Sequence, residues 1–465
     1  MSSDDRLDPA LRKLIALLIV GGSMGILDGS MVAVALRSLA ERFDTSLGAV
    51  GWVSTGYLLA LTVTIPVTGW AVDRFGGRRL WLAGLVLFGA GSLASGLAWS
   101  LPALILARVV QGMAAGILDP LMLVLLARAA GPGRAGRVMG LMGIVGSSGP
   151  ILGPIVGGAI LQVLDWRWMF LVNLPLVVVA LVGTVRVLPA EDAEAPAARL
   201  DAFGVALLGP GVAAAVLTLS QLAEGRGVGP AVLPLAVAVV LLGGYALRRR
   251  PAAPLLDLRL FTRSGFSASV LVASLLGAGT FGSLAALPLY YQLVRGHDSS
   301  AAGLLLAPLG LGSAIVMPVA GRLSDRWGSR RLVLTGGVAV GLAALLLTRV
   351  GSVTPQWELA AVTLALGAGL GCVGAPTIGS VYRTLPAELV PQGSTALYML
   401  NQLGASIGVT LVTLAVQTAH APLDGFRLAY AGLAGAMVIL VGMAAFIPGR
   451  PAPQPVDSAD AAVVR

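Results

Sequence analysis

One pattern occurs twice in this sequence, first as Gly69-Trp-Ala-Val-Asp73-Arg74-Phe75-Gly76-Gly77-Arg78-Arg79 and again as Gly321-Arg-Leu-Ser-Asp325-Arg326-Trp327-Gly328-Ser329-Arg330-Arg331. Glycine, acid, arginine, aromatic residue, glycine and paired arginine fall at the same offsets in both copies. Each copy stands between two long apolar runs, which predicts a short cationic loop joining two membrane helices. The chain is therefore expected to contain a duplication.

The composition is that of an integral membrane protein. Of the 465 residues, 57% are hydrophobic and 11% are charged, whereas soluble domains carry about 25% charged residues. The net charge of +9 could suggest a nucleic-acid partner. However, the 31 basic residues are scattered through short connections and form no basic domain, which favours a positive-inside bias. We expect no nucleic-acid partner.

The sequence contains few residues suited to redox or metal chemistry. Cys372 is the only cysteine and lies in an apolar run, so neither a disulfide framework nor a cysteine metal site is expected. We find no nucleophile and base pair, metal cluster or phosphate loop, so the protein is not expected to be an enzyme. No metal is expected.

Fourteen apolar runs are long enough to cross a bilayer of roughly 30 Å as helices. They lie at 14–36, 48–72, 79–99, 101–128, 136–163, 168–188, 202–222, 230–247, 266–293, 301–324, 331–350, 357–383, 393–418 and 427–447. The first run lacks a small-residue cleavage site, so it is interpreted as a retained span. The expected fold class is all-α integral membrane.

The positions of arginine and lysine predict the orientation. With the N-terminus inside, the inner ends of the runs carry 23 basic residues, the outer ends carry seven, and Arg108 lies within a run, which accounts for all 31. Cytoplasmic loops carry such an excess, so both termini are expected in the cytoplasm. Lys13 is the single lysine among the 31 basic residues, and Ala and Gly are abundant. This composition suggests a GC-rich bacterial genome and therefore an inner-membrane setting.

The duplicated loops follow the second and tenth runs, so six plus six spans are related, and two additional spans lie between the halves. A duplicated hydrophobic half is typical of transporters whose site lies between the repeats. The expected units are a six-helix bundle at 1–188, a linker with two additional spans at 189–263, a second six-helix bundle at 264–447, and a cytoplasmic tail at 448–465 that is expected to be disordered.

Asp28 and Arg108 are charged residues inside predicted spans, where charge is costly and usually functional. Asp28 lies roughly 21 Å from the inner face and Arg108 roughly 20 Å from the same face, at 1.5 Å per residue. The matching depths allow the two to pair, directly or through a water molecule. The alternative is an ion pair that only holds the first and fourth spans together.

Asp119 extends a polar stripe along the fourth span, because Arg108, Gln111, Ala115 and Asp119 share one helix face. This face is expected to point toward a cavity or another helix. Desolvation there disfavours the charged form of a carboxyl, which lets it load and release a proton near neutral pH. The second half has no acid in the middle of a span, so a proton carrier is expected in the first half.

The fifth span combines small residues with two prolines. Glycine lets a neighbouring helix approach closely, and proline bends a helix. A bent helix with a smooth face suits a rocking or sealing element, and the alternative is a packing face without a mechanism. The residues concerned are Gly146, Gly149, Pro150, Gly153, Pro154, Gly157 and Gly158.

The duplicated loops are candidates for a cytoplasmic gate. The glycines permit a tight turn, and a carboxylate there can meet the positive N-terminal end of a helix from the other half. The alternative is a role in topology alone. The candidate residues are Gly69, Asp73, Arg74, Gly76, Arg78 and Arg79 in the first copy and Gly321, Asp325, Arg326, Gly328, Arg330 and Arg331 in the second.

Several polar and aromatic residues of the second half are candidates to line a cavity, with packing or interface roles as the alternative. They are Tyr290, Tyr291, Gln292, Tyr398, Asn401 and Gln402.

Five motifs, in order, resemble the major facilitator superfamily and, within it, the fourteen-span drug/proton antiporter branch. They are Leu27-Asp28, Gly69 to Arg79, Arg108-Val-Val-Gln111-Gly112-Met-Ala-Ala-Gly116, Gly146 to Gly158, and Trp166-Arg167-Trp168-Met169-Phe170-Leu171-Val172-Asn173-Leu174-Pro175. The resemblance covers nearly the whole chain. It implies two six-helix bundles, alternating access by rocking, and export driven by inward proton flow.

The resemblance also implies roles for single residues. Asp28 is implied as the coupling acid and Arg108 as its partner in proton handling. Asp73 is implied at a cytoplasmic gate against residues 391–395, and Asp325 symmetrically near the start of the fifth span.

The sequence departs from the pattern of the branch at two positions. Arg37 stands where the branch usually has proline, and Asp119 stands before Pro120 where an apolar residue is usual. Asp119 is therefore a candidate for an additional cation or proton site.

Together these features predict a proton-coupled exporter of amphipathic, hydrophobic or cationic small molecules. Its expected partners are the substrate and membrane lipids, with no obligate protein partner and no cofactor besides protons as the coupling ion. One alternative is an exporter of lipids, cell-envelope precursors or a dedicated natural product, which a long connection at Ala419 to Phe426 would favour, but that connection is short. Another is a membrane scaffold or sensor, which would not need Asp28.

Overall fold

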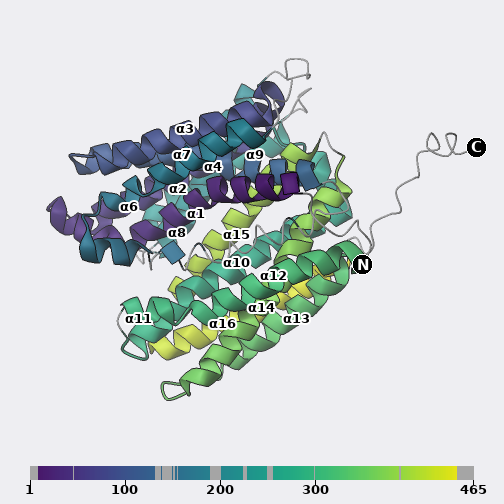
Figure 1. Cartoon of the computed structure of the whole chain (residues 1–465). Helices are drawn as coiled ribbons and strands as arrows, with labels where there is room; N and C mark the ends of the chain where they lie inside the picture. Colours follow the sequence, from purple (N-terminus) through teal and green to yellow (C-terminus); the bar gives the residue numbers. More distant parts are fainter. Residues whose placement is uncertain are drawn as a thin grey trace, which may run out of the picture.

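The computed structural model describes residues 9–45, 47–130, 138, 149, 152–153, 156–188, 200–223, 228–248, 255–297, 299–386 and 389–447. Every regular element within these residues is a helix (Figure 1). In this part of the chain, thirteen helical spans are long and apolar enough to cross a membrane. They correspond to thirteen of the fourteen predicted spans, and the remaining one, 136–163, lies mostly outside the described residues.

The helices follow the order expected for two related halves with an insertion. The first half contains α1 (Pro9–Arg42), α2 (Leu47–Phe75), α3 (Gly77–Gly96), α4 (Leu101–Ala130), α6 (Trp168–Leu171) and α7 (Asn173–Val187). The additional spans are α8 (Ala202–Ala223) and α9 (Gly229–Leu247), followed by the short 3-10 helix η2 (Leu258–Thr262). The second half contains α10 (Ser264–Leu293), α11 (Ser299–Leu304), α12 (Ala307–Trp327), α13 (Ser329–Leu347), α14 (Gln356–Thr384), α15 (Val390–Thr418) and α16 (Pro422–Ala444).

Prolines explain where the observed helices depart from the predicted boundaries. The predicted span 168–188 is divided into α6 and α7, because Pro175 has no N–H to donate to the carbonyl of Leu171. Pro308 in the first turn of α12 similarly separates that helix from α11. The last span begins with Pro422 rather than at residue 427, since proline suits the first turn of a helix.

The duplicated loop has the same backbone geometry in both halves. Gly76 joins α2 to α3 with φ 79°, and Gly328 joins α12 to α13 with φ 83°. Positive φ is costly for a residue with a Cβ atom, which explains glycine at this offset in both copies. The Gly76 amide donates to the Val72 carbonyl at 2.9 Å, and the Gly328 amide donates to the Ser324 carbonyl at 3.0 Å.

The helices gather into two groups, one of α1 to α4, α6 and α7 and the other of α10 to α16 (Figure 1). Near the duplicated loops, one hydrophobic cluster includes residues of both groups, such as Leu18 and Val72 of the first and Phe266 and Val390 of the second. The two halves therefore share a core at this end, which we call the loop end.

At the opposite end, hydrophobic clusters are formed within each group. Leu39 and Val53 belong to a cluster of first-half residues. Tyr291 and Leu347 belong to a cluster of second-half residues. The described cores thus join the halves at the loop end and keep to one half each at the far end.

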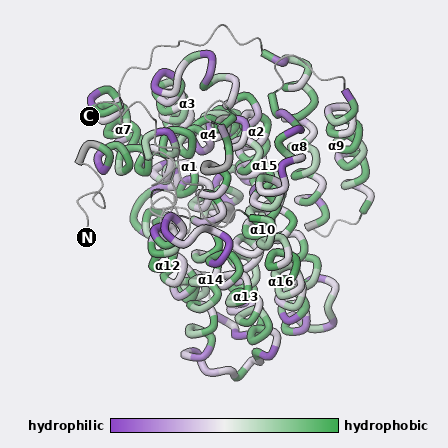
Figure 2. Tube along the Cα trace, turned by 90° about the vertical axis from the view of Figure 1, so that its right-hand side faces the viewer, coloured by the Kyte–Doolittle hydropathy of each residue, from purple (hydrophilic) through white to green (hydrophobic). Residues whose placement is uncertain are grey.

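The two additional spans lie along one side of the molecule (Figure 2). Helix α8 packs against α2 of the first group, α15 of the second, and α9. The Thr410 hydroxyl of α15 donates to the Leu219 carbonyl of α8 at 3.0 Å. Helix α8 therefore bridges the two groups.

Candidate functional site

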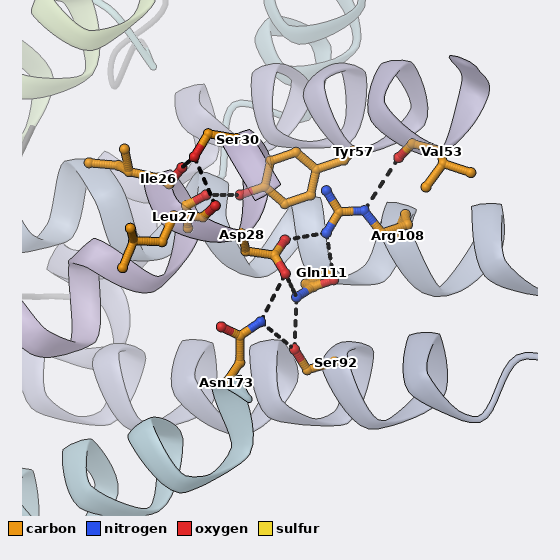
Figure 3. Close-up of polar contacts among 11 residues, drawn as sticks. Ile26, Leu27, Asp28, Ser30, Val53, Tyr57, Ser92, Arg108, Gln111 and Asn173 are labelled. Carbon is orange, nitrogen blue, oxygen red and sulfur yellow. Dashed lines mark hydrogen bonds and ion pairs between the residues drawn. The ribbon is translucent and has the colours of Figure 1, made fainter. Parts of the chain in front are cut away.

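Asp28 of α1 lies in a buried polar cluster formed by four helices of the first half (Figure 3). Its Oδ2 atom forms an ion pair with Nη1 of Arg108 on α4. Its Oδ1 atom accepts hydrogen bonds from Nε2 of Gln111 at 3.1 Å and from Nδ2 of Asn173 at 2.8 Å. Asp28 is 1% exposed and Arg108 is 0% exposed, so the pair is removed from solvent.

The partners of Asp28 are oriented by further contacts. The Ser92 hydroxyl of α3 accepts hydrogen bonds from Gln111 at 2.9 Å and from Asn173 at 3.0 Å. Arg108 Nη1 also donates to Gln111 Oε1 at 2.8 Å. Both amide groups therefore use both of their N–H bonds within the cluster, which leaves Asp28 little freedom to move.

Arg108 is packed between the ion pair and aromatic rings. Its Nε atom donates to the Val53 carbonyl at 3.3 Å. Its Cζ atom lies 4.2 Å from the centre of the Tyr57 ring and 5.6 Å from that of Phe170, which is a favourable cation–π arrangement. Nη2 of Arg108 has no hydrogen-bond partner among the described residues.

Gly149 and Gly153 of the fifth span lie against α1 beside Asp28. The Ser30 hydroxyl donates to the Gly149 carbonyl at 3.1 Å. A Cβ atom on Gly153 would clash with Ser30 Oγ and lie 3.0 Å from the Leu27 carbonyl oxygen. Close approach to α1 thus requires glycine at these positions.

The other motif residues of this span have less defined surroundings. Gly157 is buried, and a Cβ atom on Gly158 would meet no described atom within 4 Å. Gly146, Pro150 and Pro154 lie outside the described residues.

Asp119 is buried further along α4 than Arg108 and Gln111 of the Asp28 cluster. It lies on the helix face that was predicted to point toward a cavity or another helix rather than toward lipid. Its Oδ2 atom accepts a hydrogen bond from the Tyr398 hydroxyl of α15 at 2.6 Å. The fourth span therefore contacts α1 through Arg108 and Gln111, and the second half through Asp119.

The gate candidates occupy the loop end. Asp73 is half-buried, and its Oδ1 atom lies 3.9 Å from Nη2 of Arg128. Nη2 of Arg78 donates to the Val185 carbonyl of α7 at 3.0 Å. Asp325 in the second copy is half-buried as well. The implied contact of Asp73 with residues 391–395 stays a prediction.

The remaining members of the two loops divide by exposure. The first glycine of each copy is buried, and the arginines are mostly at the surface. Gly69, Gly321 and Gly328 are buried, and Arg74, Arg79, Arg326, Arg330 and Arg331 are exposed.

Most of the second-half residues that were predicted to line a cavity form hydrogen bonds with other residues of the chain. The Tyr290 hydroxyl donates to the Gly351 carbonyl at 2.8 Å, and the Tyr291 hydroxyl accepts from Gln356 at 3.1 Å, within the second-half core. Asn401 donates to the Ala273 carbonyl at 2.8 Å.

Two other candidates differ in their surroundings. Gln292 is exposed at the end of α10. Gln402 lines a cavity of about 260 Å³ between α2, α8, α10 and α15, together with Thr55, Ser220 and Ser406.

Sequence reasoning did not select Ser92, Tyr57 or Asn173 as site residues. Asn173 belongs to the motif from Trp166 to Pro175, and its place in that motif could have identified it as a site residue. Ser92 and Tyr57 are single polar residues in apolar runs, and nothing in their local pattern distinguishes them from packing residues.

The family model of the Major Facilitator Superfamily matches residues 16–409 and, in a second match, residues 270–463. This chain belongs to the major facilitator superfamily. The overlapping second match agrees with the duplication of its two halves. Members of this superfamily are transporters and not enzymes, so the chain is a multi-pass membrane transporter with the all-α fold of the superfamily.

Similar sequences in the superfamily carry resistance names. The Multidrug resistance protein B homolog of Mycobacterium tuberculosis is 36% identical over 89% of this chain and 77% of its own length. The Puromycin resistance protein pur8 of Streptomyces alboniger is 31% identical over 86% of this chain and 80% of its own length. The Lincomycin resistance protein LmrB of Listeria innocua is 28% identical over 87% and 86%. The chain thus resembles superfamily members of the multidrug efflux type.

Solved structures of the superfamily share the fold. The human organic anion transporter MFSD10 aligns with a TM-score of 0.67 at 17% identity, covering 94% of this chain and 100% of its own. The proton:xylose symporter XylE aligns with a TM-score of 0.67 at 16% identity, covering 94% and 96%.

Proposed function

We propose that this superfamily member is a proton-coupled exporter of amphipathic, hydrophobic or cationic small molecules, and that Asp28 carries the proton. The observation that supports it is the buried ion pair of Asp28 with Arg108 inside the membrane-spanning region. Buried charges of this kind in transporters usually belong to ion or proton pathways.

The geometry of the pair suggests how proton uptake is coupled to movement. Oδ2 of Asp28 can hold either a proton or the Nη1–H of Arg108 at the same position, so the two compete. Oδ1 is meanwhile held by Gln111 and Asn173. Protonation at Oδ2 therefore releases Arg108 and weakens the polar link between α1 and α4, which then rests on the hydrogen bond from Gln111 to Oδ1.

The direction of transport and the class of substrate rest on the relatives. Their names refer to resistance against multiple drugs, puromycin and lincomycin, which supports outward transport of small molecules. In this proposal the protein lies in the bacterial cytoplasmic membrane with both termini in the cytoplasm. Its partners are the substrate and lipids, without nucleic acid or an obligate protein partner, and protons are the only coupling species.

Transport assays on Asp28→Asn test this function. In everted membrane vesicles with an imposed proton gradient, the intact chain is expected to move a lipophilic dye. Asp28→Asn is expected to abolish gradient-driven transport and to retain gradient-independent exchange of dye, because the amide cannot carry the proton. Asp424→Asn, an exposed acid in the first turn of α16, is the control and should transport normally. Unchanged gradient-driven transport by Asp28→Asn contradicts the proposal.

A further inference from the structure

Asp119 and Tyr398 form a buried contact between the two halves of the transporter. Asp119 belongs to α4 of the first group, and Tyr398 belongs to α15 of the second. The 2.6 Å hydrogen bond from the Tyr398 hydroxyl to Oδ2 of Asp119 joins them directly. Asp119 is 3% exposed, so this contact is removed from bulk solvent.

The second oxygen of the same carboxyl accepts no hydrogen bond from the described residues. Oδ1 of Asp119 is buried and has no hydrogen-bond partner among the described residues. Gly25 of α1 approaches this atom closely, because a Cβ atom on Gly25 would lie 3.2 Å from Oδ1 and 3.3 Å from the Tyr57 hydroxyl oxygen. A buried acceptor without a donor is costly, which indicates that something outside the described chain completes it.

The described residues offer little positive charge to this carboxyl. In the described part of the chain, Asp119 forms no ion pair, and Arg108 on the same helix is engaged with Asp28 and packed over the Tyr57 ring. Two tyrosines, Tyr57 and Tyr398, stand beside the acid instead. A buried carboxylate without a basic partner attracts an organic cation through charge, and its free oxygen can accept a hydrogen bond from a protonated amine.

We propose that Asp119 and Tyr398 form a subsite for the cationic group of a substrate, shared between the two halves. The ligand class is a lipophilic monocation, such as a protonated amine or an onium ion. This inference rests on the proposed export function and adds a residue pair that selects among substrates. Because the subsite needs residues from both groups, its affinity depends on how the halves are placed, which links cation binding to alternating access.

Equilibrium binding to the purified full-length protein, without any gradient, tests the subsite. The probes are tetraphenylphosphonium, a monocation, and triphenylphosphine oxide, a neutral compound of similar shape. Asp119→Asn is expected to weaken phosphonium binding about tenfold or more and to change binding of the neutral compound less than about twofold. Tyr398→Phe keeps the ring but frees Oδ2, so a smaller loss is expected. Asp424→Asn is the control with an acid removed at the surface.

Asp119→Glu protects the test against a folding defect, because it keeps the charge. It is expected to retain the preference for the phosphonium over the neutral compound. The subsite is overturned if the intact chain does not bind the phosphonium, if Asp119→Asn leaves its affinity unchanged, or if both probes lose affinity equally. It is also overturned if Asp119→Glu shows no preference for the cation.

The transport assay separates this inference from the proposed function. With the subsite correct, Asp119→Asn loses gradient-driven transport of the phosphonium and keeps that of neutral substrates, whereas Asp28→Asn loses both. If the phosphonium binds through Asp119 but no gradient drives its movement, the proton-coupled function fails and the subsite stands. If neutral and cationic compounds are transported equally by Asp119→Asn, the subsite fails and the function stands.

Discussion

At the residue scale, two side-chain amide groups link Asp28 to the rest of its hydrogen-bond network. Asn173 and Gln111 hold one carboxyl oxygen, and Ser92 accepts from both of them. A buried network with this many mutual hydrogen bonds is rigid, and each missing member leaves another polar atom without a partner. This rigidity keeps Oδ2 of Asp28 directed at Arg108. At Oδ2 a proton would compete with Arg108 for the carboxylate.

Removing Asn173 should expose this dependence. Asn173→Ala takes one donor from Asp28 Oδ1 in a buried site, and we expect a loss of about 1 to 3 kcal/mol in the free energy of unfolding. Thermal unfolding of the detergent-solubilised protein measures the effect, with Gln292→Ala, at an exposed position, as the control. Equal unfolding midpoints for the two variants would show that the network contributes nothing to stability.

At the element scale, the contact of the fifth span with α1 depends on glycine. The Gly149 carbonyl accepts from Ser30, and Gly153 faces Leu27 and Ser30, on both sides of Asp28 in the sequence. Gly149 and Gly153 of the fifth span therefore pack against the segment of α1 that carries Asp28, the acid proposed to carry the proton. A change in the position of α1 must be accommodated at this glycine face.

Gly153→Ala should push these two helices apart. We expect it to destabilise the protein by about 1 to 3 kcal/mol, because the added methyl meets Ser30 and the backbone of Leu27 in a packed interface. Gly158→Ala in the same segment is the matched control, since its methyl would meet no described atom within 4 Å. Unfolding midpoints and gradient-driven transport are compared, and adding Ser30→Ala to Gly153→Ala should restore part of both. Equal behaviour of the two glycine variants contradicts the packing argument.

At the scale of the whole molecule, the two halves share a hydrophobic core at the loop end. Helix α8 bridges the groups on one side through α2 and α15. In alternating access, opening of the loop end must separate this shared core. Residues within it should therefore change their exposure during the transport cycle.

Cysteine labelling can detect this opening. In a Cys372→Ser background, Val72→Cys should react slowly with a water-soluble maleimide, because Val72 is 2% exposed in the shared core. Addition of substrate with a proton gradient should raise its rate about tenfold or more, as the open state becomes populated. Phe75→Cys, three residues further along α2 at a position 46% exposed, should react fast in both conditions. A constant slow rate at position 72 would contradict opening at this end.

The sequence alone determined the all-helical membrane class, the duplication, thirteen described spans and the family. These properties are local or periodic: apolar runs of bilayer length predict spans, and repeated offsets in Gly69 to Arg79 and Gly321 to Arg331 predict related halves. It also placed Asp28 and Arg108 at matching depth, because depth follows from residue count along a helix.

Only the tertiary structure decided which side chains meet. Asp28 accepts a hydrogen bond from Asn173, and Asp119 accepts one from Tyr398. Both donors are distant in the sequence, and Tyr398 belongs to the other half. The sequence shows the prolines at 175 and 308, but Pro66 and Pro120 lie inside continuous helices, so a proline alone did not predict which spans are divided. The physical reason is that rotation of each helix about its axis, and the choice of its neighbours, are set by packing between distant segments, which no local pattern contains.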